Sequence, residues 1–432
     1  MLSYSVMTLA STLFVGQLGA GTLAGVGLGG TVAFAVLCFS IGLLRAVKVV
    51  VSQAIGAGRR DEAIAFTGAG LWTALALGAA TIAVGEAVAS ALPLLTASEE
   101  AGRAASDYLR IRVLGAPIVL VFVALREARY GDGDSRSPMV ASVLANLANV
   151  GFLWIGVGML GWGAAGAAAA TLAAHVLEAG VLLWLTPRRL LGWSKPTWEH
   201  VWSVARVGMP TGLQFLLEVG SFTLLAAMIS RLSEVEMAAH QIALNVIHFS
   251  FLPAFAVAEA ASVLAGQAVG ANRDELVRVV ARKALLAASA YTGICTLVLG
   301  IAASEIASAF TGEPVLHQAT VHLLWVAALF QVADGANVVA RGALRGTGDV
   351  KYPAVVGVLT AWAMTPPLTW LLGYRAGLGA LGGWIGLCAE IVLGTVLVWW
   401  RLERGAWRDH AVRSRREVAR QQAEASPAAV AS

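Results

Sequence analysis

Two carboxylates interrupt long apolar stretches, and their positions suggest chemistry more strongly than any other residues in the chain. Glu218 follows Phe215-Leu216-Leu217, and Gln214 lies one helical turn earlier, on the same face of a helix. A carboxylate inside an apolar helix costs several kcal/mol unless it has a partner or faces water. Glu218 is therefore a functional candidate, and a structural ion pair that holds helices together is the alternative.

Asp334 lies in a second apolar stretch and belongs to a polar stripe. The members of this stripe recur at spacings of three or four residues, which places them on one face of a helix. They are Gln331, Asp334, Asn337 and Arg341. Because Arg341 follows Asp334 by two turns, a structural pairing of these two residues is the alternative to a functional role.

Other polar and aromatic residues in the apolar segments could line the same interior. Three of them recur at i, i+4 and i+7 on a predicted helix over 235–260, and one aromatic ring could contact an organic cation, with core packing as its alternative role. The candidates for lining a cavity are Gln214, Gln241, Asn245, His248, Gln331, Asn337, Asn149 and Phe215. The secondary candidates for a titratable or packing role are Glu178, which has His175 three residues earlier, Glu390, Glu259 and His240.

Two carboxylates in one cavity of low dielectric constant are suited to binding a coupling cation. They can bind Na⁺ with the help of neutral oxygens, or they can share a proton, because like charges held close together disfavour double ionisation. A cationic substrate would compete for the same negative charge. Mutual exclusion of substrate and coupling ion is the basis of antiport, and no other cofactor or metal site is expected.

The composition is that of a membrane protein. Of the 432 residues, 58% are hydrophobic and 13% charged, whereas soluble proteins contain about 25% charged residues. Stretches without Asp, Glu, Lys or Arg cover 137–177, 237–258, 284–304 and 352–374, and a membrane-spanning helix needs about 20 such residues. These stretches lack the alternation of barrel strands, so the predicted class is all-α. No nucleophile–base pair or His-Glu-x-x-His pattern is found, so an enzyme is not expected.

Hydropathy and turn residues predict twelve spans. They cover 1–16, 22–48, 62–95, 104–128, 137–157, 164–186, 203–230, 235–260, 275–309, 315–343, 352–373 and 380–401. The loops on one side hold 18 Lys and Arg residues and those on the other side hold five. By the positive-inside rule, the first side and both termini are cytoplasmic. Topology and anionic lipid account for the basic residues, so no nucleic-acid partner is expected.

Two sequence motifs occur once in each half of the chain. Residues 53–59 (Gln-Ala-Ile-Gly-Ala-Gly-Arg) recur at 267–273, and residues 131–138 recur at 346–353, with offsets of 214 and 215. The chain therefore divides into two six-helix lobes, over 1–190 and 203–402, related by a pseudo-two-fold axis along the membrane normal. Residues 191–202 form a cytoplasmic linker, and 403–432 form a cytoplasmic tail that is expected to be disordered.

The order and spacing of these elements carry a family resemblance. Val51-Ser52-Gln53-Ala54-Ile55-Gly56-Ala57-Gly58, Gly208-Met209-Pro210 and Arg341-Gly342-Ala343-Leu344-Arg345-Gly346-Thr347-Gly348-Asp349 resemble the corresponding elements of multidrug and toxic compound extrusion (MATE) transporters. The resemblance implies a cation site formed by Glu218 and Asp334 in the C-terminal lobe. It also implies Na⁺- or H⁺-coupled export of small organic, often cationic compounds by a monomer in the cytoplasmic membrane of a prokaryote.

The N-terminal lobe departs from the family pattern. Family members often carry an acid in the first helix and another in the fifth, but this chain has Ser11 and Leu153 at those positions, and Asn149 remains as neutral lining. The C-terminal pair is therefore the expected coupling site. The alternative function is a flippase or exporter of lipid-linked or other amphipathic cargo, although a flippase of that kind would be expected to have a cationic cavity.

Overall fold

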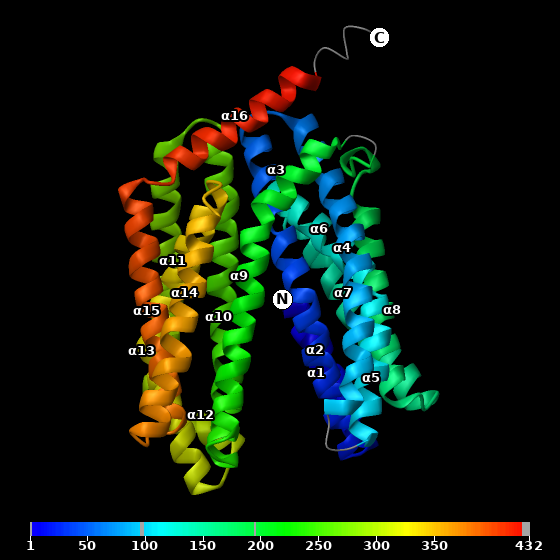
Figure 1. Ribbon diagram of the computed structural model, residues 1–432, viewed down its shortest axis with the longest axis vertical. Coiled ribbons are helices and arrows are strands. Elements are labelled where there is room, and N and C mark those ends of the chain that lie inside the picture. The colour runs from blue at the N-terminus through cyan, green and yellow to red at the C-terminus, as the bar shows by residue number, and fades with distance from the viewer. Residues whose placement is uncertain (1, 96–98, 194–195, 426–432) are drawn as a thin grey trace. The chain divides into compact units, whose positions relative to one another are not determined.

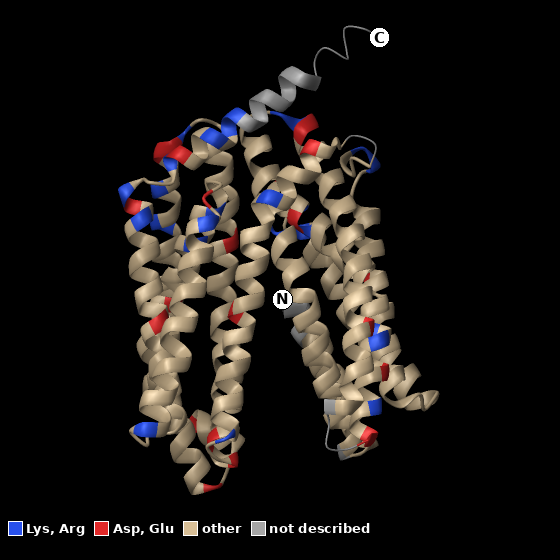
Figure 2. Cartoon of the chain, viewed as in Figure 1, with Lys and Arg blue, Asp and Glu red and all other residues tan. Residues whose placement is uncertain are grey.

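The computed structural model describes residues 2–95, 99–193 and 196–425, and the regular secondary structure in these ranges is entirely helical, with no strand. The predicted all-α class is therefore confirmed. Ten of the described helices are long and apolar enough to cross a membrane, or eleven if the bent pair of α5 and α6 counts as one span. The first helix, α1 (Leu2–Val15), is shorter than these spans. Figure 2 shows that charged residues gather toward the helix ends of each part, while the middles carry few.

The chain divides into two compact units. Unit 1 contains Met1–Val51 and Arg59–Gly212, and unit 2 contains Ser52–Gly58 and Leu213–Ser432. The division falls inside helix α9, later in the chain than the predicted linker 191–202. Six of the predicted spans lie in unit 1 and five lie in unit 2, and the division crosses the remaining span, in α9. Figure 1 shows the helices coloured from the N-terminus to the C-terminus.

Unit 1 is built from the N-terminal helices. Besides α1, they are α2 (Ala20–Leu44), α3 (Ala46–Gly56), α4 (Arg60–Leu95), α5 (Glu99–Leu114), α6 (Ala116–Gly131), α7 (Arg136–Leu153) and α8 (Gly163–Leu185). The end of α3, from Ser52, belongs to unit 2. The predicted span 104–128 is bent by 50° between α5 and α6. Pro117 in the first turn of α6 accounts for this break, because proline cannot donate the backbone hydrogen bond that would continue α5.

Unit 2 is built from the C-terminal helices. They are α9 (Trp198–Ser230), α10 (Glu234–Gly270), α11 (Asp274–Ile301), α12 (Ala303–Phe310), α13 (Pro314–Gly346), α14 (Lys351–Leu368), α15 (Ala380–Arg404) and α16 (Arg408–Ala425). Both α7 and α14 end in a π-helical segment, Trp154–Met159 and Thr369–Arg375. These segments begin 215 residues apart, which is the offset of the sequence repeat.

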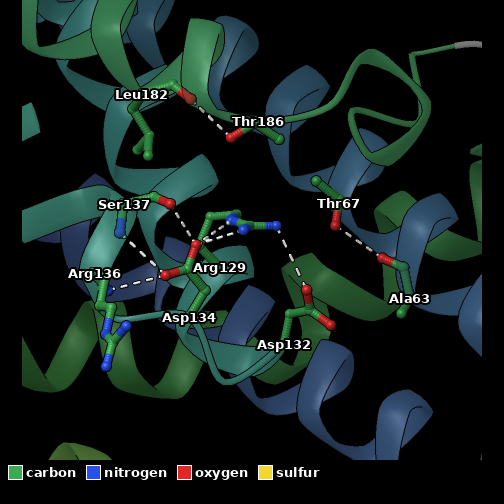
Figure 3. A network of polar contacts seen from close by, with 9 residues as sticks. All are labelled: Ala63, Thr67, Arg129, Asp132, Asp134, Arg136, Ser137, Leu182 and Thr186. Atoms are coloured by element: carbon green, nitrogen blue, oxygen red, sulfur yellow. Dashed lines mark hydrogen bonds and ion pairs between the residues drawn. The ribbon is translucent and has the colours of Figure 1, made fainter. Parts of the chain in front are cut away.

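The repeated Gly-x-Gly-Asp motif forms the turn that ends one helix and begins the next. Between α6 and α7, the Asp134 carboxylate accepts hydrogen bonds from the backbone amides of Arg136 and Ser137 and from the Ser137 hydroxyl, and it pairs with Arg129 (Figure 3). Burial alone would raise the pKa of Asp134, but the Ser137 donors and Arg129 together lower it to about 2. In the second copy, the buried Asp349 pairs instead with Arg401, at 2.6 Å.

The two copies of the Gln-Ala-x-Gly motif contact each other reciprocally within unit 2. A Cβ atom on Gly56 would lie 2.1 Å from the carbonyl oxygen of Gln267, and one on Gly270 would lie 2.0 Å from that of Gln53. Only glycine permits such a close approach of two backbones. The Gln53 side chain also donates to the carbonyl of Gly346, at 2.8 Å.

The expectation of a disordered tail was wrong for residues 408–425, which form helix α16. This helix lies at the end of unit 2 (Figure 1), where Arg415 pairs with Asp274 at 2.6 Å and Ser414 bonds to Gln53. The Trp407 side chain, just before α16, is fully buried, as is Ala411. The low hydrophobicity of the tail concealed this docking, because a few apolar side chains and a few polar contacts are enough to anchor the helix.

Candidate cation site in unit 2

Glu218 lies midway along α9 and forms an ion pair inside unit 2. Its Oε1 atom accepts hydrogen bonds from Nη1 of Arg341, on α13, and from Nε2 of Gln214, both at 2.8 Å. The Glu218 and Arg341 side chains are only 22% and 14% exposed. A structural ion pair, which the sequence offered as the alternative for Glu218, is thus present, and its partner is Arg341, a member of the polar stripe.

Close packing against α14 defines the space around this pair. A Cβ atom on Gly357 would lie 2.5 Å from Oε1 of Glu218 and 2.7 Å from Nε2 of Gln214. Glycine at this position therefore lets the polar side chains lie directly against the α14 backbone. On the other side, a Cβ atom on Gly394 of α15 would lie 2.9 Å from Nδ2 of Asn337.

Two further carboxylates lie within electrostatic range of the Arg341 guanidinium. Asp334, on α13, interacts with the charges of both Arg341 and Glu218. Glu390, on α15, interacts with these same charges and with Asp334, and it accepts a hydrogen bond from the Thr365 hydroxyl. Of these three carboxylates, on α9, α13 and α15, Glu218 alone forms an ion pair with Arg341 among the described residues. Glu390, only a secondary candidate from the sequence, belongs to this group.

The remaining members of the predicted stripe bond to neighbouring helices. Nε2 of Gln331 donates to the Ser250 hydroxyl of α10 at 2.7 Å, and Nδ2 of Asn337 donates to the carbonyl of Ile391 at 3.2 Å. Within the described chain, the buried side-chain oxygens of Gln331 and Asn337 have no hydrogen-bond partner. Two buried acceptors therefore remain available beside the carboxylates.

Most other predicted lining residues lie outside this cluster. Gln241, Asn245 and His248 form one exposed face of α10, while Phe215 and Glu259 are partly buried. The buried His240 accepts a hydrogen bond from the Trp384 indole at 3.0 Å, which accounts for it as a core residue.

Unit 1 has a polar interior of a different kind. The Glu178 carboxylate on α8 accepts a hydrogen bond from Ser142 at 2.7 Å and contacts Nδ1 of His175 at 3.1 Å. Where the family pattern would place acids, Ser11 bonds to Thr171 at 3.2 Å and Leu153 lies in an apolar core. Asn149 is fully buried and its side-chain amide has no hydrogen-bond partner in the described chain.

Unit 1 contains a buried ion pair, Lys48 with Glu127, that was not predicted from the sequence. The Glu127 carboxylate lies 3.5 Å from Nζ of Lys48 and 2.8 Å from Arg126, and the Lys48 and Glu127 side chains are almost completely buried. All three residues fall at or near the ends of predicted spans, where charged groups are usually exposed. The one available signal was the 215-residue offset, which relates Arg126 to Arg341.

Comparison with known proteins places the chain in a family. The family model MatE matches residues 1–155 and 210–371. The chain belongs to the MatE family. Two curated relatives carry the name "Probable multidrug resistance protein NorM". The protein from Bradyrhizobium diazoefficiens is 30% identical over 393 residues, covering 86% of this chain and 83% of the relative. The protein from Burkholderia pseudomallei is 30% identical over 426 residues, covering 93% and 89%.

Solved structures of MatE-like transporters have the same fold. A MOP superfamily transporter from Pyrococcus furiosus superimposes with a TM-score of 0.87 at 23% identity, covering 94% of this chain and 93% of that one. The eukaryotic MATE transporter AtDTX14 superimposes with a TM-score of 0.87 at 19% identity, covering 96% and 95%. As a MatE protein with multiple apolar helices, the chain is a multi-pass membrane transporter and not an enzyme.

Proposed function

We propose that the protein is an antiporter that exports small organic, often cationic compounds across the cytoplasmic membrane in exchange for Na⁺ or H⁺. The observation that carries this proposal is the partly buried ion pair of Glu218 with Arg341 in unit 2, in a chain of the MatE family that also carries Asp334 on α13 and Glu390 on α15. The relatives' name, multidrug resistance protein, supports the class of substrate.

The charges of these side chains explain how the site could couple export of the compound to entry of the ion. When ionised, Glu218, Asp334 and Glu390 carry three negative charges, and Arg341 supplies one positive charge. A cation entering this interior is therefore attracted, since interactions between charges are stronger in a low-dielectric environment than in water. A coupling ion and a cationic compound compete for the same negative charge, so that binding of one promotes release of the other.

The orientation and assembly form part of the proposal. The excess of Lys and Arg in one set of loops supports a cytoplasmic location of both termini. A single chain contains both six-helix halves, which supports a functional monomer. Transport then proceeds by alternating access, with the site open to one side of the membrane at a time.

The test is export of a fluorescent organic cation from proteoliposomes, with Na⁺ and H⁺ gradients imposed separately. We expect Glu218→Gln and Asp334→Asn to abolish gradient-driven export, because each removes one of the charges that attract the cation. Glu86→Gln is the matched control, since the Glu86 side chain on α4 is 42% exposed and pairs loosely with Arg110 at 3.6 Å. It should transport like wild type.

Two results would contradict the proposal. If wild-type protein exports no organic cation under either gradient, amphipathic cargo becomes the better hypothesis, and movement of a fluorescent lipid is then measured in the same vesicles. If Glu218→Gln and Asp334→Asn both transport like Glu86→Gln, the carboxylates are structural.

A further inference from the structure

The start of helix α16 is anchored in unit 2 by buried apolar side chains. Trp407, just before the helix, and Ala411, in its first turn, are both fully buried. The Trp407 indole also donates a hydrogen bond to the carbonyl of Leu402 at 3.1 Å. A buried aromatic ring with its polar group satisfied is a strong anchor, so Trp407 and Ala411 form a fixed base for the helix.

Further along, α16 contacts both copies of the Gln-Ala-x-Gly motif. The Ser414 hydroxyl donates a hydrogen bond to Oε1 of Gln53, whose Nε2 atom donates to the carbonyl of Gly346. The Gln53 side chain is only 4% exposed, and both ends of its amide are therefore bonded within unit 2. Next to Ser414, Nη1 of Arg415 donates to the carbonyl of Val269 in the second copy, at 3.3 Å.

The segment that receives Ser414 continues into unit 1 at both of its ends. Residues 52–58 belong to unit 2, whereas the chain up to Val51 and from Arg59 belongs to unit 1. A transporter with two such halves works by moving one half against the other. The contact between Ser414 and Gln53 therefore stabilises a segment that such a movement would pull upon from both sides.

The two copies of the Gly-x-Gly-Asp turn show why α16 belongs to unit 2. In the first copy, the aspartate is bound within its own turn, by the backbone amide and hydroxyl of Ser137. In the second copy, Tyr352 stands in place of Ser137. The buried Asp349 instead lies 2.6 Å from Arg401 and 3.8 Å from Nε2 of His410, on α16. The tail thus supplies contacts that the first turn makes by itself.

We propose that α16 is a strap whose base stays on unit 2 while its Ser414 contact opens and closes during transport. Ser414 binds Gln53 in one access state and releases it in the other, and Trp407 and Ala411 remain buried in both. This inference rests on the proposed alternating-access function and adds a contact that must break in each cycle. A single hydrogen bond is suited to this role, because water can replace it on both sides at a small net cost.

The first experiment closes the Ser414 contact with a reducible cross-linker. The native cysteines, Cys38, Cys295 and Cys388, are replaced by alanine, and Gln53→Cys is combined with Ser414→Cys. The purified protein is treated with a short bis-methanethiosulfonate and reconstituted in proteoliposomes. Cross-linked protein should lose export of the fluorescent organic cation under both Na⁺ and H⁺ gradients, because the strap cannot open. Dithiothreitol should restore export.

The matched control joins α16 to unit 2 without touching residues 52–58. Arg415 pairs with Asp274, at the start of α11, at 2.6 Å. Arg415→Cys is therefore combined with Asp274→Cys in the same cysteine-free background and treated with the same reagent. Cross-linking of this pair should leave export unchanged, because the base of the strap stays on unit 2 in both access states.

The second experiment measures the strap without transport and keeps Gln53 and the native cysteines. Hydrogen–deuterium exchange of residues 52–58 is followed by mass spectrometry in detergent. Ser414→Val should raise the exchange rate of this segment by about two- to tenfold, as expected for loss of one hydrogen bond. Ser414→Thr retains the hydroxyl and should exchange like wild type, and the turn at Asp134 should be unchanged in both variants.

Several results would overturn the strap. Full export by the cross-linked Gln53→Cys, Ser414→Cys protein would show that the contact need not open, and loss of export on cross-linking Asp274→Cys to Arg415→Cys would refute the fixed base. Equal exchange of residues 52–58 in Ser414→Val and wild type would show that α16 does not hold this segment. Absence of export by wild type under every gradient would instead refute the proposed function, and the exchange measurement would still test the contact.

Discussion

The ion pair between Glu218 and Arg341 can be tested by a double-mutant cycle with Glu218→Gln, Arg341→Gln and the double variant. The two residues lie 123 positions apart in sequence and join α9 to α13. The single variants should not be equivalent. Removing Arg341 leaves Glu218, Asp334 and Glu390 without the guanidinium whose charge offsets theirs, whereas removing Glu218 leaves Arg341 with two carboxylates that still interact with its charge. Arg341→Gln should therefore be the more destabilising single change.

The separation of the charges sets the magnitude. At 2.8 Å and an effective dielectric constant of about 20, Coulomb attraction between unit charges is about 6 kcal/mol. Desolvation of the two partly buried side chains offsets much of this attraction. We expect a coupling energy of about 2 kcal/mol, within the range measured for contacting pairs. The double variant should thus be more stable than the sum of the single effects predicts.

The free energy of unfolding is measured by adding SDS to protein in mild-detergent micelles and following fluorescence of the 14 tryptophans. The matched control is the pair formed by Glu86 and Arg110, separated by 3.6 Å with side chains 42% and 49% exposed. Its coupling energy should be no more than about 0.5 kcal/mol, as for surface pairs. The prediction would be refuted if the free-energy effects of Glu218→Gln and Arg341→Gln were additive. It would also be refuted if the coupling energy were the same for Glu218 with Arg341 as for Glu86 with Arg110.

Three further predictions concern the turns and ends of the helices. Trp407→Ala should destabilise unit 2 by about 3–5 kcal/mol, because it empties a fully buried site, and faster trypsin cleavage within α16 would reveal the undocking. Gly270→Ala should lower the unfolding temperature strongly, since its Cβ would lie 2.0 Å from a carbonyl oxygen, whereas Gly293→Ala, with open space around it, should not. The stabilisation from Asp134 should be complete above its ordinary pKa of 3.8 and be lost as the pH falls to about 2. Asp134→Asn should remove this dependence in thermal unfolding, and an unchanged pH profile would contradict it.

The sequence predicted the class of fold and the principal polar residues because both depend on local patterns. Apolar runs of span length identified the helices, and their interruption by Glu218 and Asp334 singled out the candidate residues. The partners of these residues could not be predicted, because the pairing of Glu218 with Arg341 depends on how α9 packs against α13. The buried pair of Lys48 and Glu127 was not predicted for a related reason. Near the end of a span, the sequence does not distinguish a charged side chain that faces water from one that faces an opposite charge.

The tail shows a second limit of local patterns. Its composition is that of a solvated segment, and the burial that orders it comes from Trp407 and from an ion pair between Arg415 and the distant Asp274. Sequence periodicity predicts which face of a helix is apolar, but it does not predict which surface of the protein that face packs against.

The crossing of the two Gln-Ala-x-Gly motifs has the form of a symmetric dimer contact. Gly56 packs against the carbonyl of Gln267, and Gly270 packs against the carbonyl of Gln53. Each copy of the motif therefore supplies one glycine and one carbonyl to the contact. In an oligomer with two-fold symmetry, one surface patch meets its own copy in this reciprocal way. In such an oligomer a single substitution would alter both sides of the contact together. In this chain the two glycines are separate positions, so each can be substituted alone, yet both must fit the same crossing.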